Sequence, residues 1–336
     1  MAQLILPRNY DPVIDLMESQ RAIKKIKDYF QQELAYGLNL RRVSAPLFVD
    51  PLTGLNDNLN GVERRVDFTL KDIDELKVEV VQSLAKWKRF ALKKYEFEPG
   101  YGLYTDMNAI RRDEDLDNLH SVYVDQWDWE AVIHREDRTV ALLIETVRKI
   151  YEVILETQKV VCEAFPALEA SLPKDIHILP TQELEDRYPE LTPKQRENAV
   201  CKEYGAVFLM QIGGKLKSGI RHDGRSPDYD DWSMNGDILV WYEPLQIAFE
   251  LSSMGVRVDE RALLEQCREA GCEDRLGLAY HKALLEGELP YTIGGGIGQS
   301  RLCMMFLQKA HIGEVQASVW PQEMLEECKK NNIHLL

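Results

Sequence analysis

The segment RRDEDL, residues 111–116, holds residue types that could do chemistry on a phosphate. Arg111 and Arg112 follow an apolar run that predicts a strand, and alternation along a strand turns only one of them toward a given face. An arginine on that face can hold a phosphate through two parallel hydrogen bonds, which a lysine cannot do. The alternative is a solvated hairpin tip of mixed charge, which this segment alone would favour.

Polar side chains alternate with tryptophans in VDQWDWE, residues 124–130. Gln126, Asp128 and Glu130 share one face of the predicted strand. Trp127 and Trp129 face the opposite side, toward the core. Three polar residues on one face form a floor that could hold an ammonium and an amide-sized group. The solvent face of an amphipathic strand explains the pattern equally well.

In QSLAKWK, Ser83 and Lys88 lie where a predicted strand passes into a helix. Lys88 could pair with a substrate carboxylate, although an exposed helical lysine is the commoner case. A different chemistry is suggested by Glu250, which stands in the apolar strand AFELSSMGVRV, where a carboxylate is costly unless it is paired or bound to a metal. With Asp237 from the preceding strand, Glu250 could hold Mg²⁺, which takes one or two protein carboxylates plus nucleotide oxygens. A buried glutamate–arginine pair is the alternative.

The segment SPDYDDW supplies Asp228, Asp230 and Asp231, with His222 and Arg225 just upstream. A solvated acidic turn is the simple interpretation. The functional one is a flexible lid that brings one carboxylate to a substrate.

The glycine-rich stretch IGGGIGQSRL, residues 293–302, matches neither common phosphate loop. A dinucleotide fingerprint that begins at Gly294 would need a glycine where Gln299 stands, and no Lys-Ser/Thr pair follows for a Walker A loop. Arg301 then opens an apolar, helix-like run. These glycines therefore need another explanation.

The composition limits the kinds of protein that this chain can be. Its 336 residues hold 41 Lys and Arg against 56 Asp and Glu, a net charge of −15, which argues against a protein that mainly grips a nucleic-acid backbone. No apolar run approaches the ~18 residues of a membrane span, and the first residues lack a signal-peptide pattern. The six cysteines show no metal-like spacing. We expect reduced thiols and a cytoplasmic location.

The elements that must position these residues can be outlined. Residues 12–36 predict an amphipathic helix that Asp11 caps. Residues 38–49 predict a strand that Pro46 interrupts and that lies at a boundary of the sheet or at a subunit contact. Residues 139–165 predict a second long helix. The polar residues 213–236 have the composition of a long exposed loop. Paired strands with short connections favour an α+β fold, with a mainly antiparallel sheet flanked by helices.

Taken together, these segments resemble the catalytic core of class II aminoacyl-tRNA synthetases. The first helix, strand and Pro46 look like motif 1, RRDE looks like motif 2, and GGGIGQSR fits the spaced glycines and final arginine of motif 3. The aspartyl/asparaginyl branch is closest. More specifically, the chain is similar from Ile23 to Trp320 to the family of ammonia-dependent asparagine synthetases, through SLAKWKR, LHSVYVDQWDWE, PDYDDW, FELSSMG and TIGGGIGQSRL.

That resemblance implies a two-step ligase. The β-carboxylate of aspartate would attack the α-phosphate of ATP, with Mg²⁺ present, to give β-aspartyl-AMP and pyrophosphate. Ammonia would then displace AMP and give asparagine. The glycine strand would leave its backbone open to a flat adenine, and Arg301 would face the nucleotide from the other side.

The resemblance also implies roles for individual residues. By family position Arg111 grips the α-phosphate, whereas a strict Arg-x-Glu spacing selects Arg112 with Glu114. The catalytic residues would be Lys88, Arg111, Asp230 and Arg301. The aspartate and ammonia contacts would be Asp57, Ser83, Gln126, Asp128, Arg225, Ser252, Ser253 and Arg257. The nucleotide contacts would be Arg111, Arg112, Glu114, Glu250, Gly294, Gly296, Gly298 and Arg301, and the Mg²⁺ ligands Asp237 and Glu250.

Three rival functions are less favoured. A tRNA ligase of this branch carries an N-terminal anticodon-binding barrel. Here the core begins near residue 12 and leaves no room for that barrel, so we expect no tRNA partner. A non-catalytic sensor would not need Lys88, Arg111, Glu250 and Arg301 together. A glutamine-dependent synthetase carries an amidase module with an N-terminal cysteine, but the chain begins Met-Ala. We expect free ammonia as the nitrogen donor, one catalytic domain over residues 1–336, and a two-fold homodimer.

Overall fold

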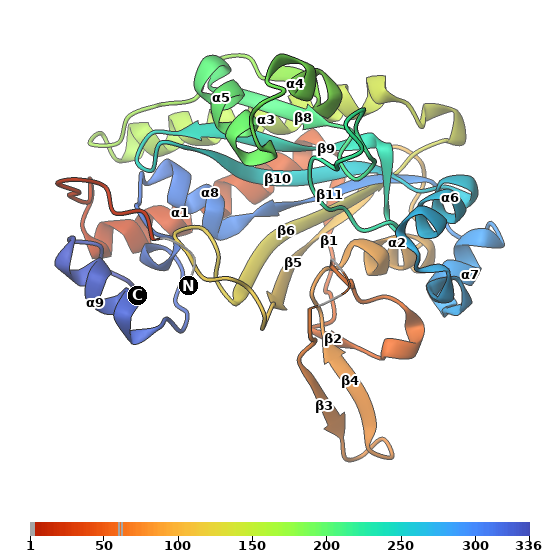
Figure 1. Ribbon diagram of the computed structural model, residues 1–336. Coiled ribbons are helices and arrows are strands. Elements are labelled where there is room, and N and C mark those ends of the chain that lie inside the picture. Colours follow the sequence, from red (N-terminus) through yellow and green to blue (C-terminus); the bar gives the residue numbers. More distant parts are fainter. Residues whose placement is uncertain (1–3, 60, 62) are drawn as a thin grey trace.

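The computed structural model describes residues 4–59, 61 and 63–336 and is built around an eight-stranded sheet (Figure 1). The strand order is β1-β5-β6-β11-β10-β9-β8-β7. Among the described residues, the pairs at the two edges, β1–β5 and β7–β8, are parallel, and the five pairs between them are antiparallel. The predicted α+β class with a mainly antiparallel sheet is confirmed. The strands of this sheet are β1 (Leu40–Arg42), β5 (Gly102–Ile110), β6 (Tyr123–Val132), β7 (His177–Pro180), β8 (Ala206–Met210), β9 (Asp230–Tyr242), β10 (Ile247–Arg257) and β11 (Thr292–Gly298).

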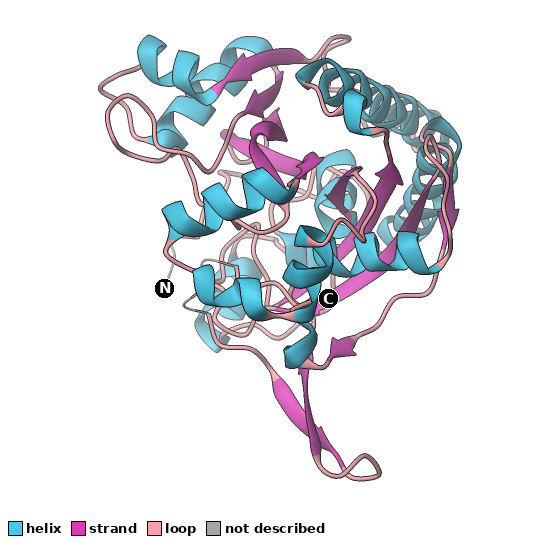
Figure 2. Cartoon of the chain, turned by 90° about the vertical axis from the view of Figure 1, so that its right-hand side faces the viewer, coloured by secondary structure: helices cyan, strands magenta, loops and turns pink. Residues whose placement is uncertain are grey.

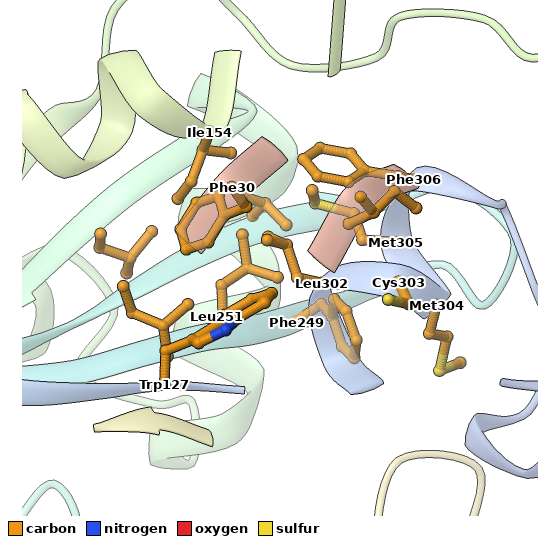
Figure 3. Close-up of a cluster of buried hydrophobic side chains, with 14 of the residues drawn as sticks. Phe30, Trp127, Ile154, Phe249, Leu251, Leu302, Cys303, Met304, Met305 and Phe306 are labelled. Carbon is orange, nitrogen blue, oxygen red and sulfur yellow. The ribbon is translucent and has the colours of Figure 1, made fainter. Parts of the chain in front are cut away.

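One face of the sheet packs on three helices, α1 (Leu16–Gly37), α3 (Val140–Ala164) and α8 (Gln299–Phe306). Figure 3 shows the centre of this core, where Phe30 of α1 and Ile154 of α3 meet Trp127 of β6. The rings of Phe30 and Trp127 have centroids 4.7 Å apart. Trp127 and Trp129 are fully buried, as the alternation in VDQWDWE predicts. The opposite face of β6 therefore carries Gln126, Asp128 and Glu130.

That opposite face is covered at two ends. Helices α4 (Thr181–Arg187) and α5 (Pro193–Tyr204) pack on β7 to β10. Helix α2 (Ala85–Lys94) packs on β6 and β11, next to α6 (Glu260–Ala270) and α7 (Ala279–Leu285). The remaining helical elements are α9 (Gln322–Lys330) and the short turns η1 (Pro51–Thr53), η2 (Arg135–Asp137), η3 (Glu273–Gly277) and η4 (Ile312–Glu314).

A second, three-stranded sheet forms an arm that projects from the body in both views (Figures 1 and 2). Its order is β2 (Phe48–Val49), β4 (Leu76–Val80), β3 (Asp67–Leu70). The single strand predicted over residues 38–49 is therefore two strands in two sheets, divided around Pro46. The prediction of a boundary position is confirmed, because β1 is an edge strand.

Three other local predictions need correction. Helix α1 begins at Leu16 with Asp15 as its cap, because the Asp15 side chain accepts from Glu18 N at 2.8 Å. Strand β5 ends at Ile110, so Arg111 lies just beyond the strand. Residues 213–236 are not one exposed loop, since β9 begins at Asp230.

None of the described helices is long and apolar enough to cross a membrane. All six cysteines are free thiols.

Candidate active site

Residues of β6, β9, β10, β11, α2 and α8, and of the connecting segments that hold Asp57, Ser83, Arg111 and Arg225, line a cavity of about 540 Å³, here called the main cavity. It lies on the face of the sheet that carries Gln126 and Asp128. Thirteen residues that the sequence singled out line it: Asp57, Ser83, Arg111, Glu114, Gln126, Asp128, Arg225, Asp230, Glu250, Ser253, Arg257, Gly296 and Arg301. Segments from across the whole sequence thus contribute to one site.

A narrower recess of about 60 Å³ adjoins the main cavity and shares Arg111, Gln126 and Arg301 with it. Its other walls include Leu119, Val124, Leu251, Ser252, Gly298, Ile312 and Gln316. Four residues to which the resemblance gave site roles line neither space: Lys88, Arg112, Asp237 and Gly294.

Lys88 is fully buried beneath the floor of the main cavity. Its ammonium contacts the Asp128 carboxylate and donates to the carbonyl oxygens of Trp129 and Gly295 at 2.9 and 3.0 Å. Burial lowers the pKa of Lys88, although the neighbouring Asp128 carboxylate opposes this effect. Lys88 therefore ties β6 to β11 and fixes Asp128, rather than reaching into the cavity.

Arg257 and Glu130 form a buried pair beside that floor. Arg257 Nη2 lies 2.9 Å from Glu130 Oε2, and the same guanidinium also contacts Asp230. Burial would raise the pKa of Glu130, but Arg257 and Lys88 outweigh it and hold the pKa below its usual value. Arg257 thereby fixes the carboxylate of Asp230, the first residue of β9.

The glycines of β11 leave room for side chains that arrive from β6. A Cβ at Gly294 would lie 2.3 Å from Glu130 Oε2, and one at Gly296 would lie 2.4 Å from Gln126 Oε1. At Gly294 such a Cβ would also lie 2.7 Å from the backbone oxygen of Trp129, so only glycine fits there, whereas at Gly296 the end of the Gln126 side chain would have to move. The resemblance implied a glycine strand whose backbone is open to adenine. In the structure, the side chain of Gln126 lies over Gly296 and that of Glu130 lies over Gly294.

The two adjacent arginines of RRDEDL take different places. Arg111 lines both the main cavity and the recess, and its buried Nε has no hydrogen-bond partner in the described part of the chain. Arg112 is exposed, and its Nη1 lies 3.5 Å from the Arg65 carbonyl. Glu114 lines both spaces with Arg111.

His120, which the sequence did not single out, supports Arg301 at the junction of the two spaces. Arg301 Nη2 lies 3.0 Å from His120 Nε2, and His120 Nδ1 lies 2.9 Å from Asp117 Oδ1. Since the guanidinium can only donate, Nε2 accepts and Nδ1 donates to Asp117. Arg301 Nη1 also donates to the Glu250 carbonyl at 3.1 Å. The only signal in the sequence was one histidine in LHSVY, which is too weak alone.

Asp237 and Glu250 are the residues that could hold a metal. Arg225 Nη2 lies 2.5 Å from Asp237 Oδ1 and also bonds Ser253 through Nη1, while Arg301 lies 3.3 Å from Glu250 Oε2. The pKa of Asp237 is raised to about 6, mainly by burial. The Arg225 charge lowers this pKa, and the nearby Glu250 charge raises it further. The described residues contain no group of three His, Cys, Asp or Glu that could hold a metal ion. Two carboxylates that repel each other fit Mg²⁺ only if further oxygens come from a bound nucleotide.

The remaining polar residues of the site are held mainly by the backbone. Asp57 is 2% exposed and accepts from Leu59 N at 3.0 Å; none of the described lysines or arginines forms an ion pair with it. Ser83 accepts from Ala85 N at 3.2 Å, and Ser252 donates to the Gly296 carbonyl at 3.0 Å.

The lining of the main cavity is acidic. Its four arginines are Arg111, Arg225, Arg257 and Arg301, and its nine carboxylates are Asp57, Glu63, Asp113, Glu114, Asp115, Asp128, Asp223, Asp230 and Glu250. Such a cavity attracts small cations, while its arginines can hold a phosphate.

Comparisons with known proteins agree with this geometry. The family model described as aspartate-ammonia ligase matches residues 17–332. The chain is 62% identical over 336 residues to an aspartate–ammonia ligase from Ruminiclostridium cellulolyticum and 60% identical over 336 residues to one from Clostridium perfringens, and both alignments cover all of each chain.

Solved structures show the fold. The asparaginyl-tRNA synthetase from Pyrococcus horikoshii complexed with asparaginyl-adenylate aligns with a TM-score of 0.64 at 15% identity, over 90% of this chain and 70% of that one. The aspartyl-tRNA synthetase from Entamoeba histolytica aligns with a TM-score of 0.59 at 16% identity, over 89% and 57%. The class II synthetase-like fold is confirmed.

Proposed function

The chain belongs to the aspartate–ammonia ligase family and is an ATP-dependent ligase that makes asparagine from aspartate and ammonia; we propose that the reaction passes through β-aspartyl-AMP and releases AMP and pyrophosphate. The lining of the main cavity is the observation that supports this proposal most directly. Arginines suited to a phosphate and carboxylates suited to an ammonium line one space.

Aspartate binds on the polar floor of the main cavity. Asp57, Gln126 and Asp128 receive its α-ammonium, with Ser83 and Ser253 nearby, because these side chains line the cavity. Lys88 holds the Asp128 carboxylate in place from below. Arg257 acts in the same way on Glu130 and Asp230.

ATP lies with its α-phosphate on Arg111, whose buried Nε lacks a partner in the described part of the chain. Glu114 is beside it, and Arg301 faces the nucleotide at the junction with the recess. The recess, with Ser252, Gly296 and Gly298 in its wall, takes the base. Asp237 and Glu250 would hold Mg²⁺, which supplies charge neutralisation on the phosphates. Arg112 stays outside the site.

In the first step, an oxygen of the substrate β-carboxylate forms a bond to the α-phosphorus, and the bond to pyrophosphate breaks. Arg111 and Arg301 stabilise the negative charge that spreads over the phosphoryl oxygens. In the second step, ammonia bonds to the activated carbonyl carbon and AMP leaves with the electron pair of the broken bond.

Ammonium must lose a proton before it can attack. The acidic lining concentrates the cation, and Asp230, with Arg225 close by, organises it beside the adenylate. We expect Asp230→Asn to slow the ammonia-dependent step more than adenylate formation. Single-turnover kinetics measure the two steps separately. If each step has the same rate in the variant as in the wild type, Asp230 does not have this role.

The products test the reaction. The chain, incubated with aspartate, MgATP and ammonium, should yield asparagine, AMP and pyrophosphate in equal amounts. Formation of ADP and phosphate, or strict dependence on glutamine or on tRNA, would overturn the proposal.

We also propose that the enzyme is a cytoplasmic two-fold homodimer whose residues 1–336 form one catalytic domain and that it binds no tRNA. Cell fractionation tests the location, and sedimentation equilibrium tests the dimer. Limited proteolysis tests the single domain, and a filter-binding assay tests the absence of tRNA binding.

A further inference from the structure

Gln316 is a buried amide in the wall of the recess. It is 4% exposed and follows η4 in the chain. Its Nε2 donates to Ser300 Oγ at 3.0 Å and to Asp125 Oδ1 at 3.3 Å. Its Oε1 is buried and has no hydrogen-bond partner in the described part of the chain.

The orientation of this amide follows from its neighbours. Asp125 is paired with Lys27, whose Nζ lies 3.1 Å from Asp125 Oδ2, and Asp125 Oδ1 also accepts from Ser300 N at 3.0 Å. An ionised carboxylate can only accept, so the nitrogen of Gln316, not its oxygen, must face Asp125. The carbonyl oxygen is therefore left as an acceptor without a donor, which is unusual for a buried polar atom.

The rest of the recess is suited to a flat ring. Leu119, Val124, Leu251 and Ile312 supply apolar contacts, and Gly298 lines the recess beside Arg301. A heterocycle in this recess would lie beside Gln316, whose buried Oε1 is an acceptor that lacks a hydrogen.

We propose that Gln316 Oε1 accepts a hydrogen bond from the exocyclic 6-amino group of the ATP base and so selects a 6-aminopurine. This inference rests on the proposed function, which assigns the recess to the base. A purine with a keto oxygen at position 6 would place two acceptors against each other and leave both unpaired. A purine without any 6-substituent would leave Oε1 unpaired but would not repel it.

Pyrophosphate exchange in the presence of aspartate measures the selection, with ATP, purine riboside triphosphate and inosine triphosphate as nucleotides. We expect wild-type kcat/KM to fall about tenfold when the 6-amino group is removed, the effect of one hydrogen bond, and further with the 6-keto group. Equal use of ATP and purine riboside triphosphate by the wild type would overturn the inference without any variant.

Gln316→Met keeps the length of the side chain and removes the acceptor. In this variant the preference for ATP over purine riboside triphosphate should fall to about one. Gln299→Met is the matched control, because Gln299 is also a buried glutamine that donates to a carboxylate, Asp106, at 3.1 Å, but it lines neither space. That control should keep the wild-type preference.

The outcomes distinguish a failure of the proposed function from a failure of the role of Gln316. No exchange with any nucleotide in the wild type would contradict the proposed function. Exchange with a preference that Gln316→Met leaves unchanged would contradict the role of Gln316 alone.

Discussion

At the scale of single residues, buried ion pairs beneath the site hold the carboxylates that line it. Lys88 and Asp128 show this, because the buried ammonium has no route to a substrate except through the carboxylate that it holds. Alternation along VDQWDWE was enough to predict which side chains of β6 share a face. It could not show that Lys88 lies underneath, since the contact joins residues 40 positions apart.

Replacing Lys88 with methionine should destabilise the fold, because Asp128 would be left buried without its cation. The expected loss is about 3–5 kcal/mol in the free energy of unfolding, measured by urea titration. Lys93→Met on the same helix is the control, since Lys93 is largely exposed in its pair with Glu288 and should change stability by less than about 0.5 kcal/mol. A stable Lys88→Met protein with only a raised KM for aspartate would argue instead for direct substrate contact.

The two adjacent arginines provide a second comparison. Arg111→Lys should lower kcat/KM for ATP about a hundredfold, because lysine cannot reproduce a bidentate grip on a phosphate. Arg112→Lys should stay within about threefold of the wild type, since Arg112 is exposed. The reverse order of these effects in steady-state assays would show that the strict Arg-x-Glu spacing identifies the phosphate ligand.

Some residues of the site could not be predicted from the sequence, and the reason is physical. His120 and Gln316 are single polar residues in connecting segments, where no periodicity marks a face. Their importance comes from Arg301, Asp125 and Ser300, which the fold brings to them.

At the scale of elements, long helices and strand pairs could be predicted, but the polar segment after β8 could not. Residues 213–236 have a loop composition, yet Asp228 is fully buried and contacts Lys86 at 3.1 Å and His281 at 2.9 Å. These partners lie 142 and 53 positions away in the chain, so no local pattern could show that the charge is compensated.

The short turn η4 gives a pH-dependent test. His311 is buried, its Nδ1 accepts from Gly313 N at 3.0 Å, and burial lowers its pKa to about 4 from 6.5. The unfolded chain therefore binds a proton more readily than the folded one between about pH 4 and 6.5, and the contribution of His311 to stability is lost as the pH falls through that range. The loss should reach about 3 kcal/mol or less.

His311→Asn keeps an acceptor at the cap and removes the titrating group. Unfolding measured from pH 7 to pH 4 should show a smaller loss of stability in this variant than in the wild type. Parallel curves would mean that His311 does not carry this part of the acid sensitivity.

At the scale of the whole molecule, the order of the strands determines the site. Thr292 of β11 donates to Glu130 of β6 at 2.7 Å across 162 positions of sequence, and this pairing places the glycines under Gln126 and Glu130. Local patterns predicted an α+β fold and an antiparallel sheet. The strand order itself was not predicted, because strand pairing at such distances has no local signal.

The central claim is that aspartate is activated as its β-adenylate. Aspartate labelled with ¹⁸O in its β-carboxylate, turned over with MgATP and ammonium, tests it by mass spectrometry of the products. One labelled oxygen should appear in the phosphate of AMP, because the carboxylate oxygen that attacks the α-phosphorus stays with AMP when asparagine forms. Label in inorganic phosphate, or AMP without label, would contradict the account.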